Sequence, residues 1–353
     1  MDTQHISPVS LSGNEKIELI SNLSTMLGAG IPILDAVNSM MEDSKGNVKK
    51  ILETIKNDLM QGKRVSASLA HFPRSFDKVT VNLIKASEEA GTLEVTLVDL
   101  RNHIREEMEF IDKIKFALLY PVIIMIVFAL VLFVILIFVV PKISMVFSRL
   151  RVELPLPTRI MVFMSDILIR QTWALIIGSV AGILLFIIFF RRKRQLVLEV
   201  FFSLPLVSGL IKMVDLTRFS RSMYLLLSSG LPIITALELT RDVVFKSKTS
   251  RIIAHSRELV MSGKRLSEGF RLAGGYFPSI LVKLIESGEK SGTLDKAMKD
   301  ISEYLDYQVS NILKAFTAIL EPVMLVIVGI CVGGMMLAII APIYGLIGQV
   351  GGR

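Results

Sequence analysis

The chain contains few of the residues that metal proteins and redox enzymes depend on. Its 353 residues include one cysteine and four histidines. The single cysteine, Cys331, excludes an intrachain disulfide framework and most cysteine-based metal sites. The histidines are scattered and show no metal-ligand spacing: His5, His71, His103 and His255. The sequence therefore predicts no bound metal.

Signatures of common catalytic sites are missing as well. The sequence has no glycine-rich loop ending in Gly-Lys-Ser or Gly-Lys-Thr, no His-Glu-x-x-His and no Gly-x-Ser-x-Gly. We predict that the protein is not an enzyme and needs no cofactor. Residues 1–14 are polar and lack the apolar core of a signal peptide, so we expect later segments to direct any membrane insertion.

Apolar residues, by contrast, are abundant. They make up 52% of the chain, and the mean hydropathy is +0.59, which is high for a soluble protein. The 40 Lys and Arg and the 32 Asp and Glu residues must then lie mainly in soluble domains. The net charge of +8 fits the excess of Lys and Arg on the cytoplasmic side of membrane proteins, and we predict no nucleic-acid binding.

Three uncharged apolar runs have the length that a helix needs to cross a bilayer, about 20 residues. They are Ala117–Val140, Trp173–Phe190 and Pro322–Ile343. Such a run is a poor candidate for a buried helix of a soluble protein, because it carries no polar face. The sequence therefore predicts three transmembrane helices, at 116–140, 173–190 and 315–343.

Basic residues beside these runs set the expected orientation. Arg191–Arg194 follow the second run, and four basic residues precede the first: Arg101, Arg105, Lys113 and Lys115. Because positive flanks stay in the cytoplasm, we predict a multi-pass inner-membrane protein with a cytoplasmic N-terminus. The expected order is a tail at 1–11, cytoplasmic domains at 12–115 and 191–314, an external loop at 141–172 and an external tail at 344–353. The loop carries a net charge of +3, on the side that this rule disfavours.

The soluble part of the sequence repeats itself at an interval of about 201 residues. Residues 27–33 match 227–233, Gly62-Lys63-Arg64 matches Gly263-Lys264-Arg265, and residues 88–93 match 289–294. Each unit is thus a domain of roughly 100 residues that leads into an apolar run. Two copies of one fold lie most simply on the same membrane face, which requires an even number of crossings between them.

Within each unit the pattern of apolar and breaking residues is helical. Apolar residues from Ile17 to Leu27 recur with a period of 3.6. Gly30 with Pro32, and Gly230 with Pro232, predict helix breaks, because glycine adopts positive φ and proline suits a first helical turn. We predict an all-α membrane protein with two helical-bundle domains of about six helices each. No glycine or proline interrupts 93–120 or 293–321, which predicts a stiff helix from each domain into its span.

Two related motifs are candidates for function. The first contains Glu88 and Gly91, and the second contains Gly288, Glu289 and Gly292. In one interpretation each final glycine ends a helix and each glutamate is exposed nearby. In the other, the motifs form a surface that contacts a partner protein.

A further candidate is Glu321, beside Pro322 at the expected cytoplasmic mouth of the third span. A carboxylate is costly to bury there, so it either reaches water or pairs with a basic group of another helix or a partner. Pro121 and Pro322 begin their spans and leave backbone carbonyls without donors, which predicts close helix packing. Small residues in the third span permit such packing: Gly329, Gly333, Gly334 and Ala338.

Together these features resemble the type II secretion F-protein family, which includes the inner-membrane platform proteins of type IV pili. The resemblance covers nearly the whole chain. Its motifs are the repeated Gly-x-Pro break, Gly-Glu-x-Ser-Gly-x-Leu at 288–294, Tyr120-Pro121, Val140-Pro141, Leu-Pro-Leu-Pro-Thr at 154–158, Leu-Pro-Leu at 204–206, and Glu321-Pro322. The first copy of the glutamate motif begins with Ser87 and lacks the leading glycine.

The resemblance implies a non-enzymatic scaffold for the assembly of type IV pili or of a type II secretion pseudopilus. Its implied partners are a hexameric ATPase, pilin or pseudopilin subunits, other inner-membrane assembly proteins, the lipid bilayer and further copies of the chain. The alternative from the residues alone is a small transporter built from parallel repeats, although three spans are few for a transport pathway. The net charges of the two domains, −2 for 12–115 and +8 for 191–314, predict different partners.

Overall fold

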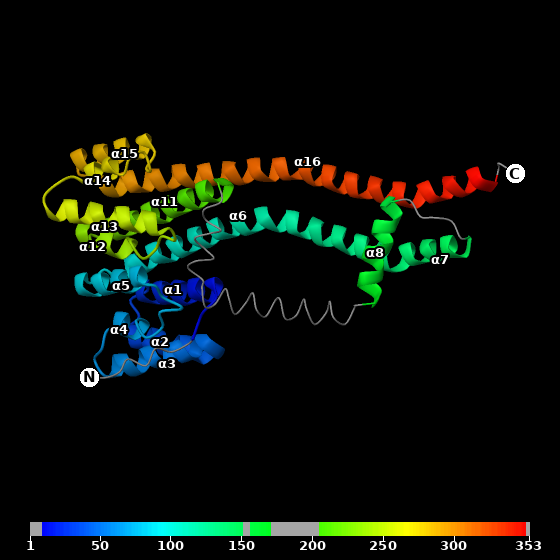
Figure 1. Ribbon diagram of the computed structural model, residues 1–353. Coiled ribbons are helices and arrows are strands. Elements are labelled where there is room, and N and C mark those ends of the chain that lie inside the picture. The colour runs from blue at the N-terminus through cyan, green and yellow to red at the C-terminus, as the bar shows by residue number, and fades with distance from the viewer. Residues whose placement is uncertain (1–8, 151–155, 171–204, 351–353) are drawn as a thin grey trace. The chain divides into compact units, whose positions relative to one another are not determined.

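The computed structural model describes residues 9–150, 156–170 and 205–350. In these residues every regular element is a helix, and no strand occurs. The chain divides into two compact units. The described residues of the first unit are 9–113 and 205–310, and those of the second are 114–150, 156–170 and 311–350. Figure 1 labels the helices.

The N-terminal half of the first unit is built from six helices. Five of them are short: α1 (Gly13–Gly28), α2 (Ile33–Asp43), α3 (Gly46–Met60), α4 (Val65–Leu69) and α5 (Lys78–Ala90). The sixth, α6 (Leu93–Val134), starts in this repeat and continues into the first apolar run. The sequence predicted about six helices for this repeat.

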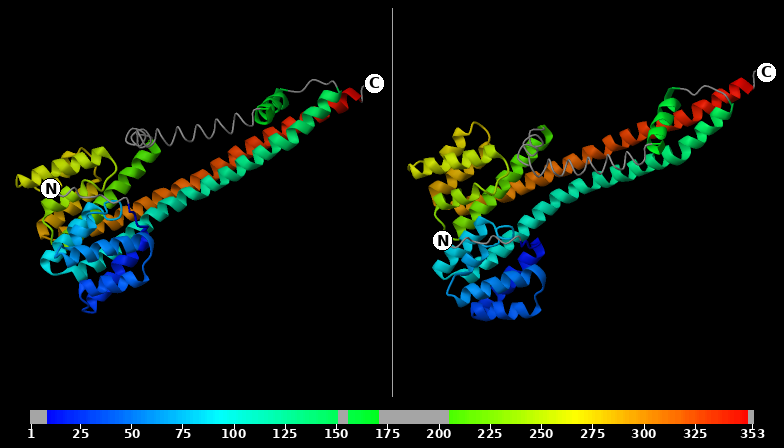
Figure 2. Two further views of the ribbon diagram at one scale, coloured as in Figure 1. Left: turned by 90° about the horizontal axis from the view of Figure 1, so that it is seen from below. Right: turned by 60° about the horizontal axis from the view of Figure 1, so that its bottom comes forward.

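The second half of the unit has the same order of helices. They are α11 (Pro205–Ser228), α12 (Ile233–Thr240), α13 (Ser247–Met261), α14 (Leu266–Leu272), α15 (Ser279–Ser291) and α16 (Leu294–Val350). Helices α3 and α13 have 15 residues each, and α5 and α15 have 13 each. Figure 2 shows α1–α5, in blue to cyan, and α12–α15, in yellow shades, as separate groups. The predicted repeat of six helices is therefore present in both halves.

An apolar core holds each repeat together. In the second repeat the ring of Phe270 stacks 4.3 Å from that of Phe277 and meets Phe219 edge-on at 5.6 Å. All three side chains are at most 4% exposed. In the first repeat the buried Leu69 and Phe72 stand at the positions that match Phe270 and Phe277. Burial of such a side chain contributes about 1.5–3 kcal/mol.

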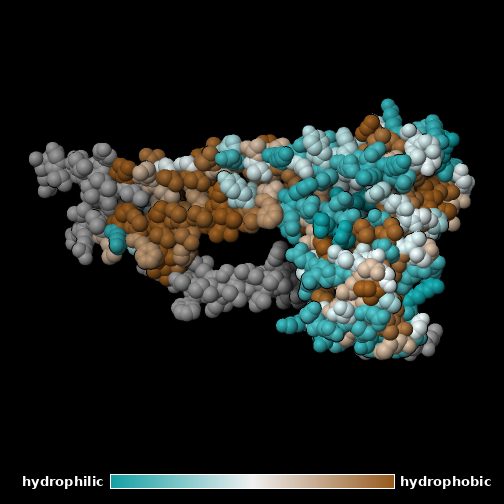
Figure 3. Space-filling view, turned by 180° about the vertical axis from the view of Figure 1, so that it is seen from behind, coloured by the Kyte–Doolittle hydropathy of each residue, from teal (hydrophilic) through white to brown (hydrophobic). Residues whose placement is uncertain are grey.

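The apolar parts of α6 and α16 are exposed instead. Their most apolar stretches are only 6% buried, although both helices are long and apolar enough to cross a membrane. The core helix of a soluble protein would be covered by other elements, so both are candidate membrane spans. Figure 3 shows their side chains as brown surfaces, while the repeats are largely teal and white. The remaining predicted span, 173–190, lies outside the described residues.

The expected loop at 141–172 is helical where the structure describes it. A short π-helix, η1 (Ile135–Val139), links α6 to α7 (Val140–Leu150), and α8 (Leu156–Arg170) packs against η1. The buried hydroxyl of Ser165 in α8 donates a 2.6 Å hydrogen bond to the carbonyl oxygen of Leu136 in η1. At the other end of the chain, α16 continues to Val350, past the predicted end of the third span at 343.

Candidate functional site

The glutamate of the first motif caps a helix of its own repeat. The carboxylate of Glu88, in α5, accepts hydrogen bonds from the backbone N–H groups of Val65 and Ser66 at 2.7 and 3.2 Å. These are the first N–H groups of α4, and the N-cap residue Arg64 provides no side-chain bond for them. A carboxylate at a helix N-terminus satisfies unpaired donors and interacts favourably with the helix dipole.

The second motif reproduces this arrangement. Glu289, in α15, accepts from the backbone N–H groups of Leu266 and Ser267, the first two residues of α14, at 2.5 and 3.1 Å. Both glutamates are half-buried. Because both oxygens of each carboxylate bind the backbone, the geometry gives these residues an internal role. A partner contact through Glu88 or Glu289 stays a prediction.

The final glycines of the motifs end α5 and α15, as one of the two interpretations predicted. Gly91 and Gly292 are C-caps in the left-handed conformation, with φ of 70° and 69°. In each copy the following threonine N–H donates 2.9 Å to the carbonyl five residues back and closes the turn. A side chain at this φ is strained, which explains glycine at both positions.

Close packing accounts for Gly288. A Cβ atom added there would lie 2.7 Å from Cβ of Ala297 in α16, closer than side chains pack. In the first repeat the matching Ser87 is buried, and its hydroxyl donates 2.8 Å to the carbonyl of Ile84. The first motif has Ser87 instead of a leading glycine because the packing at this position differs between the two repeats.

The two Gly-x-Pro breaks also match between repeats. Gly30 and Gly230 have φ of 76° and 81°. Pro32 and Pro232 stand at the N-cap, one position before the predicted first turn, and each carbonyl accepts a 2.9 Å hydrogen bond from the N–H four residues on. Each break ends the first helix of its repeat and begins the second, α1 and α2 in one repeat and α11 and α12 in the other. Their role is therefore in the fold of the repeat.

The candidates at the span entrances lie inside continuous helices. Pro121 is within α6, and Glu321 and Pro322 are within α16. Glu321 is exposed, and no ion pair joins it to another described residue. That Glu321 reaches water, or pairs with a basic group of another helix or a partner, stays a prediction. The close helix packing expected at the prolines stays a prediction.

Ion pairs between the repeats were missed by the sequence analysis. Three of them join α6 to the second repeat: Arg218–Glu107 at 2.8 Å, Arg221–Glu106 at 3.6 Å and Lys113–Asp306 at 2.9 Å. The hydrogen-bonded partners Arg218–Glu107 and Lys113–Asp306 are 111 and 193 residues apart in the sequence. No local pattern could have identified them, because each residue alone resembles any exposed charge on a helix.

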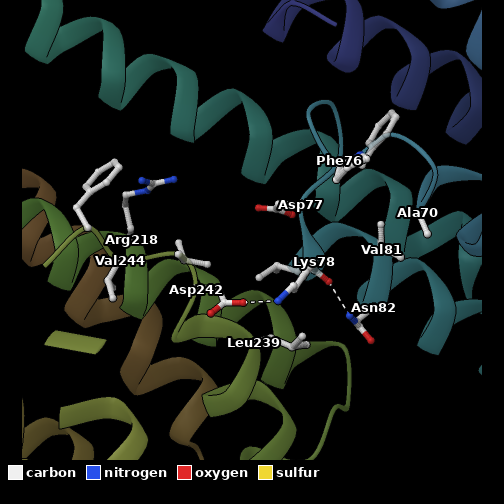
Figure 4. Close-up of a pocket in the computed structure, with 14 residues that line it drawn as sticks. Ala70, Phe76, Asp77, Lys78, Val81, Asn82, Arg218, Leu239, Asp242 and Val244 are labelled. Atoms are coloured by element: carbon white, nitrogen blue, oxygen red, sulfur yellow. Dashed lines mark hydrogen bonds and ion pairs between the residues drawn. The ribbon is translucent and has the colours of Figure 1, made fainter. Parts of the chain in front are cut away.

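A groove of about 590 Å³ lies between α5 and the segment that joins α12 to α13. Figure 4 shows Lys78 reaching Asp242 across this groove, with Nζ and Oδ2 2.6 Å apart. The guanidinium of Arg218 lies 4.6 Å from the ring centroid of Phe245 in the same groove. Two acidic side chains, Asp77 and Asp242, balance Lys78 and Arg218, so the groove has no strong preference for either charge.

Among the residues with a described position, no group of three or more His, Cys, Asp and Glu side chains could hold a metal ion. The site residues of the repeats that the sequence singled out form helix caps, helix breaks and one close helix contact, and those at the span entrances lie inside α6 and α16. The described residues define a class of protein: a helical protein with two matching repeats, each of which leads into a long apolar helix that is a candidate membrane span.

Comparison with known proteins identifies the family within this class. The family model described as "Type II secretion system (T2SS), protein F" matches residues 19–141 and again 219–342. The chain belongs to this family. Each match begins inside the first helix of one repeat and runs through most or all of the long helix that ends it, which agrees with the internal repeat found in the sequence.

Curated relatives match almost the entire chain. A type IV pilus assembly protein PilC from Pseudomonas aeruginosa is 30% identical over 338 residues, which cover 93% of this chain and 89% of that protein. A PilC protein from Thermus thermophilus is 29% identical, with 92% and 81% covered. A type II secretion system protein F from Pseudomonas aeruginosa is 28% identical, with 95% and 84% covered.

Proposed function

We propose that the chain is a non-enzymatic platform of the inner membrane on which a type IV pilus or a type II secretion pseudopilus is assembled. The observation that carries the proposal is the match of both repeats and nearly the full chain to proteins named for pilus assembly and type II secretion. The two exposed apolar helices support a place in the membrane.

In this proposal the two repeats lie in the cytoplasm and contact a hexameric ATPase. The apolar helices contact pilin or pseudopilin subunits and other assembly proteins, and several copies of the chain associate. The unbroken helices α6 and α16 support a mechanical role, because each runs from a repeat into an apolar stretch without a flexible linker. Motion of the ATPase would reach the pilins through them.

Co-purification from membranes tests this function. A tagged full-length chain, extracted in a mild detergent, is expected to retain the secretion ATPase and the major pilin or pseudopilin of its own cell. A multi-span inner-membrane protein with the same tag serves as the control and should retain neither. Normal fibre assembly and normal secretion in cells that lack the chain would overturn the proposal.

A further inference from the structure

Two lysines of the second repeat lie beside the ring of one tyrosine, and a third lysine is near them. The ammonium groups of Lys212, in α11, and Lys248, in α13, lie 4.8 and 4.9 Å from the ring centroid of Tyr276. The tyrosine hydroxyl is bonded to the hydroxyl of Thr249 at 2.8 Å, which fixes the ring between them. Lys246 completes this lysine cluster, and its Nζ donates to the carbonyl and hydroxyl of Ser208 at 2.8 and 2.9 Å.

The positive charge of the cluster is not balanced by ion pairs. No acidic residue in the described part of the chain lies within ion-pair distance of the three lysines. Asp215 is the nearby acid, but it is fully buried. Its carboxylate already accepts from the N–H groups of Phe245 and Lys246 and from the hydroxyl of Thr249.

The lysines consequently repel one another. Burial lowers the pKa of Lys212, and the neighbouring charges of Lys246 and Lys248 lower it further. Burial also lowers the pKa of Lys246; Asp215 opposes this shift and Lys248 adds to it. An anion placed among the three ammonium groups would relieve this repulsion.

The fold does not require two of the three lysines. Ser12 and Asn47 stand at the positions of the first repeat that match Lys212 and Lys248. Both are neutral and are used internally: Ser12 forms the capping box of α1, and Asn47 donates to the carbonyl of Ser10. Lys246 matches Lys45, the N-cap of α3, so Lys212 and Lys248 are the two charges that only the second repeat carries.

The cluster lies at the end of its unit where α6 leaves it. Helices α11 and α6 run in opposite directions in Figure 1, and Arg218 of α11 pairs with Glu107 of α6. Lys212 is six residues, or about 9 Å, from Arg218 in the direction of Lys113. The uncharged run of α6 begins four residues after Lys113, so the lysine cluster is near the expected membrane surface.

We propose that Lys212, Lys246 and Lys248, with Tyr276, bind the phosphate headgroup of an anionic phospholipid at the cytoplasmic face of the membrane. This rests on the cytoplasmic placement of the repeats in the proposed function. Basic side chains next to a membrane span are attracted to anionic headgroups, with about 1 kcal/mol for each residue. An acidic partner protein would need a matching acidic surface, whereas the lipid is available wherever the chain is inserted.

The test uses the full-length chain in an uncharged detergent. Dioctanoyl phosphatidylglycerol is titrated while the unfolding temperature is measured, with dioctanoyl phosphatidylcholine and inorganic phosphate at the same concentrations for comparison. Phosphatidylglycerol is expected to raise the unfolding temperature, and the other two are not. An equal rise with inorganic phosphate would mean that free phosphate is the ligand and would overturn the lipid assignment.

Variants locate the binding. Lys212→Gln with Lys248→Gln should weaken phosphatidylglycerol binding about 30-fold, because two contributions of about 1 kcal/mol are lost and 1.4 kcal/mol is a factor of ten. The double variant Lys49→Gln with Lys50→Gln removes the same charge from exposed positions of α3 and should bind as the parent does. Lys212→Arg with Lys248→Arg keeps the charge and should keep the binding, which separates charge loss from misfolding.

Two results would overturn the inference. In one, the double variant Lys212→Gln with Lys248→Gln binds phosphatidylglycerol as tightly as the parent. In the other, the same double variant still binds phosphatidylglycerol but no longer captures the ATPase, which would make the lysine cluster a protein contact. Capture of the ATPase by the parent chain is measured separately, so failure of the lipid site leaves the proposed function standing.

Discussion

At the residue scale, the motifs that mark the repeat act on the backbone. Glu88 and Glu289 each satisfy two N–H groups of a helix that begins 23 residues earlier in the sequence. The sequence indicated that glutamate stands near a helix end, because a glycine follows it. It could not show that the carboxylate caps another helix, since that contact depends on how α5 packs beside α4.

The capping role predicts a stability effect. Glu289→Ala should lower the free energy of unfolding by about 1–3 kcal/mol, because two buried N–H groups lose a charged acceptor. Urea unfolding of the full chain in detergent measures this, and amide exchange should quicken at Leu266 and Ser267. The control is Glu89→Ala, whose carboxylate is 51% exposed and forms only a surface pair with Arg64; its effect should stay below about 1 kcal/mol.

These measurements distinguish the two predicted roles of Glu289, the helix cap and the partner contact. Unchanged unfolding of Glu289→Ala together with loss of the ATPase would favour the partner contact over the cap. Glu88→Ala provides the matching test in the first repeat, where the same two bonds are made to α4.

Gly288 allows a second test at this scale. Gly288→Ala places a Cβ atom 2.7 Å from Cβ of Ala297 and should cost about 1–3 kcal/mol through overpacking. Ala297→Gly in the same chain should restore part of the loss. Gly209→Ala is the control, because open space surrounds that helical position, and it should be neutral or stabilising by up to about 1 kcal/mol. Additive losses in the double variant would contradict the contact.

A pH effect is expected at Asp58. Burial alone would raise the pKa of this carboxyl, but the hydrogen bond and charge of Lys63, at 2.9 Å, and the nearby His71 bring it below its ordinary value of 3.8. A carboxyl whose pKa is lower in the folded chain contributes stability above pH 3.8, and that contribution is lost as the pH falls through the folded pKa.

Asp58→Asn should therefore destabilise the chain by about 1–2 kcal/mol at neutral pH. The difference from the parent should shrink as the pH is lowered below about 3.8. Unfolding temperatures across this range measure it, with the exposed Asp43→Asn as the control. A difference that is constant with pH would show that the charge of Asp58 is not responsible.

At the scale of the elements, α6 and α16 are unbroken helices from Leu93 to Val134 and from Leu294 to Val350. The predicted continuity is confirmed, since neither Pro121 nor Pro322 interrupts its helix. A continuous helix can transmit a push or a rotation, and a flexible linker dissipates it. That the chain uses these helices in this way stays a prediction.

Insertions test the coupling. Seven residues of Gly and Ser placed after Asp112 or Ile312 should abolish fibre assembly while membrane insertion and ATPase capture persist. Seven residues of Ala, Glu and Lys at the same points are the control, because two helical turns preserve both stiffness and, nearly, the face that the helix presents. Fibre assembly at the normal rate with the Gly-Ser insertion would exclude rigid coupling.

At the scale of the whole molecule, the repeat and the apolar runs were predictable because each leaves a local signal. Gly30 and Gly230 mark helix ends through backbone conformation, and uncharged runs follow from the cost of burying charge in lipid. The contact between the repeats was not predictable. Its pairs, such as Lys78–Asp242, join exposed charges that are 164 residues apart, and their geometry exists only after folding.

The expected topology is a property of the whole chain, and fusions of reporter proteins test it. A reporter at about residue 200 should be active in its cytoplasmic form, because it follows the basic cluster Arg191–Arg194. Reporters at about residue 155 and after residue 350 should be external. The fusion at 155 is the critical one, since the segment 141–172 carries a net charge of +3.

The C-terminal fusion decides the number of crossings. Three spans with a cytoplasmic N-terminus place the C-terminus outside, where Arg353 is the only basic residue after the third run. Replacing Arg191–Arg194 with glutamine should weaken the orientation signal and give mixed reporter activity at 200. The matched control replaces four exposed lysines of the first repeat with glutamine and should leave the orientation unchanged: Lys45, Lys49, Lys50 and Lys85. A cytoplasmic signal from the C-terminal fusion would exclude three spans. The chain would then not cross the membrane twice between the repeats and once after the second repeat, as predicted.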